Sequence, residues 1–340
     1  MKKMLASFLS FITIIMIFSL NAAAQTEYEE IKTDTPPEIL FLGDSIATGY
    51  GLDGYKSGKE NCESYANILA YKYANQLKGK CKTAMKNSAI DGQTSSELLS
   101  GLNHGIYDED LRNSDAVIIS IGGNDLLTVL WDFVSDNFNI NFNDSYTENQ
   151  ENNPNFTQII QSITSLGSKI DHNLKSFDSN LAQIAKYIKN KSNGILIIQT
   201  LYNPFDQLGQ EQVKEFIADK IKALNSSIEA HKNDSEANYI VADVYSEFYG
   251  KGNELTRISS MDIHPNQQGH KVIAQCVDKT IGTEKYTYLI EKPDTAVQSN
   301  NIRKNSNQKV IFAALVCIGI IVVIISVIGI LKMKSRKQGE

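Results

Sequence analysis

Five short apolar runs recur along the middle of this chain, each bounded by glycine, proline or polar residues. They lie at residues 39–42, 83–85, 116–121, 195–198 and 239–242. Runs of this length are typical of buried strands. We predict helices in the segments between and after them, at residues 64–77, 95–102, 180–189, 210–230 and 267–280. Strands that alternate with helices favour a mainly parallel sheet with helices on both faces, so we predict an α/β fold with three layers, α/β/α, around five strands.

The first 24 residues have the pattern of a secretory signal peptide. A basic start, Met1-Lys2-Lys3, precedes an apolar stretch at residues 4–20, and Ala22-Ala23-Ala24 forms a small-residue cleavage site. The alternative is an uncleaved membrane anchor, which the short apolar stretch and the good cleavage site disfavour. We therefore expect the chain to be exported.

Near the other end, residues 310–331 carry no charge and are long enough to cross a hydrocarbon core of about 30 Å. Lys332, Lys334, Arg336 and Lys337 follow at once, which favours a cytoplasmic location for residues 332–340. A buried core helix would not be apolar all round and then end in a basic tail. We predict a single transmembrane helix with the rest of the mature chain outside the cell.

The exported part divides by composition into a domain and a linker. We place the domain at residues 37–283, with a polar insertion at 136–155 that is rich in Asn, Asp and Glu, and a linker at 284–309. The whole chain carries a formal charge of −6, while its two ends are basic, so the body is strongly acidic. Such a body offers no electrostatic surface for nucleic acid, and we expect the apolar helix to provide any membrane attachment.

Three of the four cysteines, Cys62, Cys81 and Cys276, lie in the exported part, and the fourth, Cys317, lies in the predicted span. A disulfide between Cys62 and Cys81 is possible in an exported protein. We disfavour it, because a helix over the intervening residues would hold the two thiols about 20 Å apart.

The most informative polar segment is Gly43-Asp44-Ser45, which follows the first apolar run. At the carboxyl edge of a parallel sheet, a turn can expose a reactive side chain to a ligand. A serine after glycine is more often a turn residue, and a nucleophile also needs a base and donors for an oxyanion. Three other segments contain such groups: Gly92 with its backbone N–H, Asn124 with its amide, and His264 before Pro265.

Together these segments resemble the GDSL-type, or SGNH, hydrolases, a family of esterases and lipases. Gly43-Asp44-Ser45, Asn87 to Gly92, Gly122-Gly123-Asn124-Asp125 and His264-Pro265 occur in the family's order within residues 37–282. The resemblance implies a flavodoxin-like fold, Ser45 as nucleophile and His264 as base. It also implies oxyanion donors from the Ser45 N–H, the Gly92 N–H and the Asn124 amide, and it implies no metal ion and no organic cofactor.

One segment departs from the family pattern. The orienting aspartate usually stands three residues before the histidine, where this chain has Met261, whereas Asp262 stands only two before His264. Either Asp262 orients the imidazole from a reshaped loop, or a backbone carbonyl near residues 259–261 does so. Both alternatives stay open at this point, with Asp262 favoured.

Other polar residues have simpler interpretations. Asp44 is expected to stabilise its turn, and Asp125 is expected to cap the next helix or to place a negative charge at its start. Tyr50, Tyr202 and Asn203 lie in loops at the predicted edge and are candidate substrate contacts. The other four histidines have no motif around them.

These observations predict an extracellular serine esterase, anchored in the cell membrane, that cleaves acetyl or acyl esters of glycans, lipids or small molecules. The polar insertion favours glycans or small esters over long-chain lipids. The alternative is a surface module that binds or adheres without catalysis, for which the displaced aspartate is the only support. The sequence does not indicate an oligomeric state.

Overall fold

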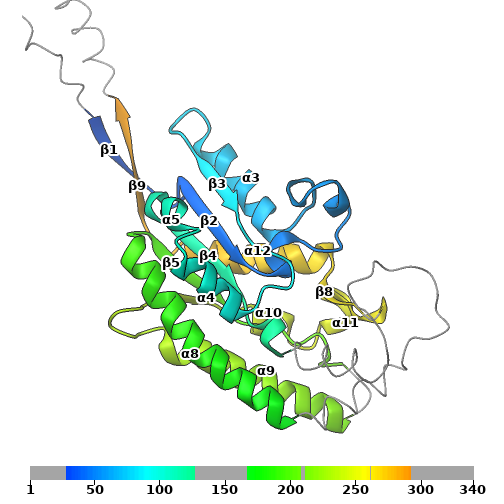
Figure 1. Cartoon of the computed structure of the whole chain (residues 1–340). Helices are drawn as coiled ribbons and strands as arrows, with labels where there is room; N and C mark the ends of the chain where they lie inside the picture. The colour runs from blue at the N-terminus through cyan, green and yellow to red at the C-terminus, as the bar shows by residue number, and fades with distance from the viewer. Residues whose placement is uncertain (1–27, 127–166, 208–210, 261, 292–340) are drawn as a thin grey trace, which may run out of the picture. The chain divides into compact units, whose positions relative to one another are not determined.

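A computed structural model describes residues 28–126, 167–207, 211–260 and 262–291 (Figure 1). Its centre is a sheet of parallel strands in the order β3-β2-β4-β5-β6. These strands are β2 (Glu38–Gly43), β3 (Ala84–Asn87), β4 (Ala116–Ser120), β5 (Ile195–Gln199) and β6 (Ile240–Ala242). Each predicted run overlaps one of them, so the prediction of a five-stranded parallel sheet in an α/β fold is confirmed.

The strand order reverses between β2 and β4. The chain passes from β2 to β3 on one side, and then adds β4, β5 and β6 on the other side. Gly43 pairs with Ser120 at the carboxyl ends of β2 and β4. In open α/β sheets, ligands bind outside the carboxyl ends of the strands at such a reversal. The segments that follow Gly43 and Ser120 therefore lie where a site is expected.

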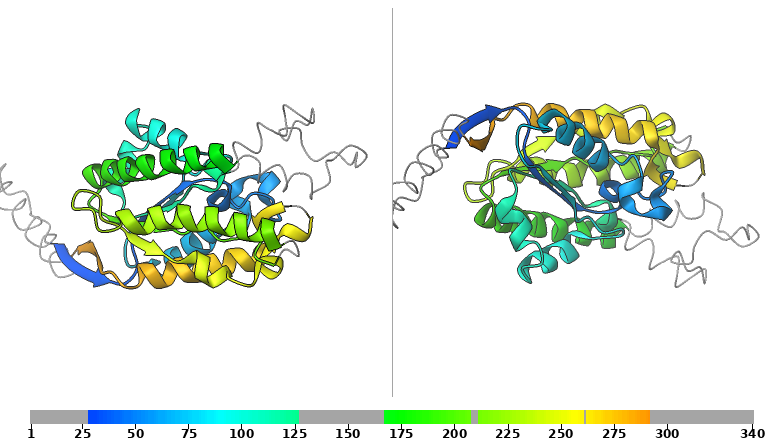
Figure 2. Two further views of the ribbon diagram at one scale, coloured as in Figure 1. Left: turned by 90° about the horizontal axis from the view of Figure 1, so that it is seen from below. Right: turned by 90° about the horizontal axis from the view of Figure 1, so that it is seen from above.

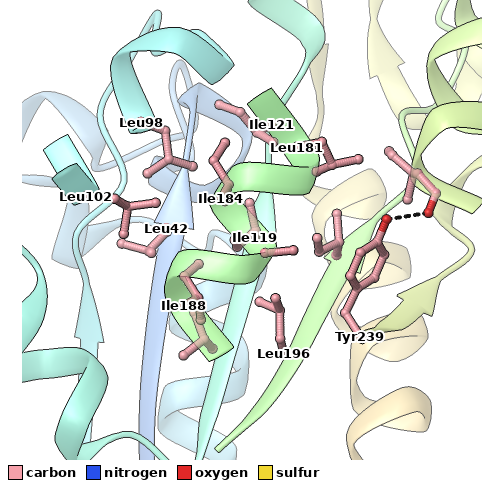
Figure 3. Packing of buried hydrophobic residues seen from close by; sticks show 14 of the residues in the cluster. Leu42, Leu98, Leu102, Ile119, Ile121, Leu181, Ile184, Ile188, Leu196 and Tyr239 are labelled. Atoms are coloured by element: carbon pink, nitrogen blue, oxygen red, sulfur yellow. Dashed lines mark hydrogen bonds between the residues drawn. The ribbon is translucent and has the colours of Figure 1, made fainter. Parts of the chain in front are cut away.

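Helices cover both faces of the sheet (Figures 1 and 2). One face packs against α4 (Ser95–Asn103), α8 (Gly167–Lys191) and α9 (Glu211–His231), and the other against α3 (Tyr65–Leu77) and α12 (Gln267–Ile281). Because successive strand residues point to opposite faces, Leu40 and Leu42 join the first cluster while Ile39 and Phe41 join the second. Figure 3 shows leucine and isoleucine side chains of the first cluster between sheet and helices.

Helix α8 begins at Gly167, well before residue 180, where the sequence analysis placed its start. Its buried residues Ile170, Leu174, Phe177 and Leu181 recur every three or four positions along one face. The apolar stripe thus continues upstream of the predicted start, and the longer helix buries more of it against the sheet. The predicted start at residue 180 was wrong because the sequence analysis recognised only the carboxyl-terminal part of this apolar stripe.

Shorter elements connect these layers, and the sequence analysis identified none of them. They are α2 (Ser45–Thr48), η1 (Tyr55–Ser57), η2 (Lys59–Asn61), α5 (Asp108–Asn113), α10 (Val244–Phe248), α11 (Gly252–Leu255), β7 (Thr256–Arg257), η4 (Ile258–Ser260) and β8 (Asp262–Pro265). Strands β7 and β8 pair in antiparallel fashion and form a small sheet of their own.

The start of the predicted linker is a strand. Strand β9 (Tyr286–Glu291) pairs with β1 (Tyr28–Thr33) in a two-stranded sheet, and Tyr286 is buried against the second core cluster. Alternate residues of β9 differ in exposure, which is the period of a strand. The linker prediction for residues 284–309 was therefore wrong at residues 286–291, because a pattern of only six residues was too short to recognise.

Several predictions concern residues outside the described ranges: the signal peptide at 1–24, the insertion at 136–155 and the apolar segment at 310–331. Among the helices that the structure describes, none combines the length and apolar character needed to span a bilayer. The disfavoured disulfide is absent, since both Cys62 and Cys81 carry free thiols.

Candidate active site

Ser45 is the first residue of α2 and follows β2 through a tight turn. Gly43 has φ of 119°, and a Cβ atom there would lie 1.8 Å from the Ser120 carbonyl oxygen. Only glycine fits between the two strands at this point. Asp44 then caps α2, because its carboxylate accepts the Ile46 N–H at 3.1 Å. The turn leaves the Ser45 side chain partly exposed at the carboxyl edge of the sheet.

His264 reaches Ser45 from the small β7–β8 sheet. Its Nε2 atom lies 2.9 Å from the Ser45 hydroxyl oxygen, although 219 residues separate the two in sequence. This distance is within the range required for a base to take the proton of a nucleophile. The structure thus brings together the two residues that the sequence analysis assigned as nucleophile and base.

Asp262 contacts the other side of the imidazole. Its Oδ1 atom lies 2.6 Å from His264 Nδ1 and accepts the His264 backbone N–H at 2.9 Å. Side chains two apart in a strand lie on the same face, so β8 places Asp262 beside His264 despite the altered spacing. Of the two alternatives for the partner of Nδ1, the structure contains the carboxylate. With Nδ1 donating to Asp262, Nε2 accepts the Ser45 hydroxyl proton.

The charge state of Asp262 suits this geometry. Burial raises the pKa of its carboxyl, but hydrogen bonds from His264 and the positive charge of Arg257 outweigh that effect, so the pKa lies below its usual value. Asp262 is therefore ionised at neutral pH. A carboxylate in this position holds the imidazole ring in one tautomer and stabilises it when it becomes protonated.

Gly92 lies in a turn that is attached to the end of β2. The Ile90 N–H donates to the Gly43 carbonyl at 2.8 Å, and the Gln93 N–H closes the turn on the Ile90 carbonyl at 3.2 Å. Gly92 itself has φ of 74°, and among the residues that the structure describes, its chain neighbours aside, no atom lies within 4 Å of the position that a Cβ would take. The turn therefore presents an unhindered glycine next to the segment that carries Ser45.

Asn124 lies at the same turn. Its Nδ2 atom donates to the Gln93 carbonyl at 3.0 Å, one residue beyond Gly92. The neighbouring Asp125 is buried, and its carboxylate accepts the Ser95 N–H at 2.9 Å. Asp125 thus accepts the first N–H of α4, whose N-cap is Thr94, and joins the Asn124 segment to α4. The structure brings two of the three proposed oxyanion donors, Gly92 and Asn124, into one loop cluster.

The three candidate substrate contacts differ in accessibility. Tyr50 is 45 % exposed, and its ring centroid lies 4.9 Å from that of His264. Tyr202 and Asn203 are buried: the Tyr202 hydroxyl donates to the Ile263 carbonyl at 2.8 Å, and Asn203 accepts the Phe205 N–H at 2.9 Å. Both support neighbouring segments, Tyr202 the β8 segment and Asn203 a loop, so Tyr50 is the exposed one of the three candidate contacts.

The sequence analysis missed Arg257, whose guanidinium contacts Asp262 Oδ2 at 2.8 Å. No motif surrounds this residue, and only the pairing of β7 with β8 brings it to the site. Within the described ranges, no three His, Cys, Asp or Glu side chains are grouped so as to hold a metal ion.

Comparisons with known proteins found sequence relatives and a protein of similar fold. An uncharacterized protein of Bacillus subtilis, YpmR, is 23% identical over 286 residues, which cover 83% of this chain and 96% of that protein. An uncharacterized protein of Mycoplasma pneumoniae is 31% identical over 101 residues, 30% of this chain but only 10% of that protein. An extracellular lipase from Streptomyces rimosus shares the fold with a TM-score of 0.51 at 17% identity, over 72% of this chain and 99% of the lipase.

The model of the GDSL-like lipase/acylhydrolase family matches residues 41–272, a span that includes Ser45, Gly92, Asn124 and His264. This match covers more than half of the chain. The chain belongs to the GDSL-like lipase/acylhydrolase family.

Proposed function

We propose that this protein is a serine esterase that hydrolyses carboxylic esters through an acyl-enzyme. The observation that carries the proposal is the continuous hydrogen-bonded line from the Ser45 hydroxyl through the His264 ring to the Asp262 carboxylate, at 2.9 and 2.6 Å. Such a line allows a serine hydroxyl, which is a weak nucleophile by itself, to lose its proton as it attacks.

In the first half of the proposed reaction, Ser45 Oγ attacks the ester carbonyl carbon while His264 Nε2 takes the hydroxyl proton. The resulting oxyanion is stabilised by the Ser45 and Gly92 N–H groups and the Asn124 amide. The carbon–oxygen bond to the alcohol then breaks, and the imidazolium gives its proton to the leaving oxygen. Ser45 is left as an acyl ester.

In the second half, water attacks the acyl carbon and loses a proton to His264. The bond to Ser45 Oγ breaks, Oγ regains the proton from the imidazolium, and the carboxylic acid product leaves. The leaving alcohol departs beside His264, where the exposed ring of Tyr50 lies. An aromatic surface at this place favours an alcohol portion with a flat apolar face, such as a sugar ring, and the polar composition of residues 136–155 also favours glycans or small esters over long-chain lipids.

The test is hydrolysis of p-nitrophenyl acetate, butyrate, octanoate and palmitate by the purified full chain and by its Ser45→Ala variant. We expect the wild type to release p-nitrophenol fastest from the short esters, and Ser45→Ala to lose at least about 1,000-fold in rate. Preference for palmitate would contradict the substrate ranking. Absence of turnover, together with failure of a fluorophosphonate to label Ser45 in the folded protein, would reject the esterase and favour the binding module. The binding-module alternative rested only on the displaced position of Asp262 in the sequence. In the structure, Asp262 Oδ1 lies 2.6 Å from His264 Nδ1.

We also propose that the protein is exported and anchored in the membrane by residues 310–331, with the domain outside the cell. Support comes from the signal-peptide pattern at residues 1–24 and from the basic residues that follow the apolar segment. Treating intact cells with a protease and then probing for the domain would test this arrangement. Protection of the domain in intact cells, with digestion after lysis, would contradict it.

A further inference from the structure

Arg257 links two parts of the site that are distant in the sequence. Its Nη2 atom lies 2.8 Å from Asp262 Oδ2 and donates to the Tyr50 carbonyl at 2.9 Å. Its Nη1 atom donates to the Gly51 carbonyl. One guanidinium thus contacts both the carboxylate beside His264 and the loop that follows α2. The reaction proposed above assigns no role to this residue.

The two oxygens of Asp262 have separate partners. Oδ1 accepts both hydrogen bonds from His264, whereas Oδ2 receives the guanidinium of Arg257. Without Arg257, the half-buried Oδ2 would have no charged partner, and the carboxylate would be held only through Oδ1. Asp262 lies on a strand of only four residues, which offers little other support. The guanidinium therefore fixes the orientation of the carboxylate that holds the imidazole.

The loop on the other side fits closely against the guanidinium. Gly51 has φ of 77°, and a Cβ there would lie 2.1 Å from both terminal nitrogens of Arg257. The adjacent Tyr50, whose carbonyl Arg257 also binds, places its ring 4.9 Å from the ring of His264. Arg257 is thus connected to His264 by two routes, through the Asp262 carboxylate and through the Tyr50 ring.

We propose that Arg257 is a positioning residue for His264, which holds the displaced Asp262 and the Tyr50 ring in place so that Nε2 stays directed at Ser45. This inference rests on the proposed esterase function. Arg257 contacts none of the reacting atoms and acts only through its two neighbours. The planar guanidinium contacts the carboxylate and two carbonyls at once, whereas a lysine ammonium cannot span all three from one position.

The test measures the nucleophile directly, through the rate at which a fluorophosphonate labels Ser45 in the full chain, together with kcat and KM on p-nitrophenyl butyrate. We expect Arg257→Gln to lower the labelling rate and kcat by about 100-fold, because small displacements of a catalytic group have effects of this size. KM should change by less than about twofold. Arg257→Lys should restore part of the activity, leaving a loss of about tenfold.

The pH profile of kcat/KM separates positioning from a general loss of stability. Burial raises the pKa of Asp262, while His264 and, to a smaller extent, Arg257 lower it, so removing Arg257 raises this pKa. The acidic limb reports protonation of the coupled His264–Asp262 system, and loss of a neighbouring positive charge makes this protonation easier. The limb should therefore move to higher pH in Arg257→Gln and much less in Arg257→Lys. Tyr202 also lies near Asp262, but burial raises its pKa well above its usual value, so it stays neutral over the tested range. Burial lowers the pKa of His270 to about 3, so this ring also stays neutral. Asp44, whose pKa burial raises to about 7, is present in every variant, so the shift is measured against the wild-type profile.

Two further variants complete the design. Gly51→Ala disturbs the same contact from the loop side and should reproduce a part of the loss, also if Arg257→Gln fails to fold. Arg112→Gln is the matched control, because Arg112 is exposed on α5 and pairs only loosely with Asp108, at 3.8 Å. It should leave labelling and kcat unchanged.

The outcomes distinguish the two proposals. If the wild type is labelled and active but folded Arg257→Gln reacts equally fast with the same pH profile, the positioning role is wrong and the esterase stands. A loss that merely follows the fraction of unfolded protein would also reject the positioning role. If the wild type itself is neither labelled nor active, the proposed function fails and this inference fails with it.

Discussion

The buried carboxyl of Asp44 leads to a prediction about stability that is independent of catalysis. Asp44 is 1% exposed between β2 and α2, and its carboxylate accepts hydrogen bonds from the Ile46 N–H and the Ser120 hydroxyl, at 3.1 and 3.3 Å. Burial raises its pKa from 3.8 to about 7, although these hydrogen bonds and the charge of His264 act in the opposite direction. The folded protein therefore binds this proton more tightly than the unfolded chain does.

The sign and size of the effect follow from this difference. The stabilisation from the Asp44 proton is fully present below pH 3.8 and is lost as the pH rises towards about 7. A shift from 3.8 to about 7 corresponds to about 4 kcal/mol in the free energy of unfolding. Between pH 5 and pH 8 the loss amounts to roughly 3 kcal/mol.

Asp44→Asn removes this titration and retains the cap of α2, because asparagine caps helices as well as aspartate does. We expect urea unfolding, followed by circular dichroism at 222 nm, to show a smaller loss of stability between pH 5 and pH 8 in the variant than in the wild type, by roughly 3 kcal/mol. Asp53→Asn, at an exposed position in the following loop, is the control and should keep the wild-type dependence. An Asp44→Asn variant with the same pH dependence as the wild type would refute the reasoning.

Three other substitutions test the site and the core. Asp262→Asn should lower kcat on a short ester by about 1,000-fold while the melting temperature changes little, since the amide no longer fixes the imidazole tautomer; activity near the wild-type level would remove Asp262 from the mechanism. Phe177→Ala should lower the free energy of unfolding in urea by about 3–5 kcal/mol, because Phe177 is fully buried in the first core cluster. A loss below about 1 kcal/mol would contradict this packing. Thr94→Ala should cost about 1 kcal/mol through loss of the capping box with Glu97, whereas no change would show that the cap contributes nothing.

The parallel sheet and much of the candidate site could be predicted from the sequence because both depend on local patterns. Residues 116–119 of β4 are all apolar because the strand is covered on both faces, and this pattern is visible without knowledge of its neighbours. Ser45, Gly92 and Asn124 lie in the segments that follow three of the predicted strands, so the topology of a parallel sheet brings these segments to one edge. Short elements such as β8 and β9 have too few residues to show a hydrophobic pattern that predicts a strand.

The contacts around His264 were decided only by the tertiary structure. The sequence left two candidates for the partner of the imidazole, Asp262 and a backbone carbonyl. Which of them lies near the ring depends on the path of the chain. Strand β8 places Asp262 beside the ring of His264. Arg257 donates to the Gly51 carbonyl although 206 residues separate the two in sequence. The spacing of apolar residues along the chain does not predict such a contact. Hydrophobic patterns determine which face of an element is buried, whereas the partner of a polar side chain depends on how separate elements pack.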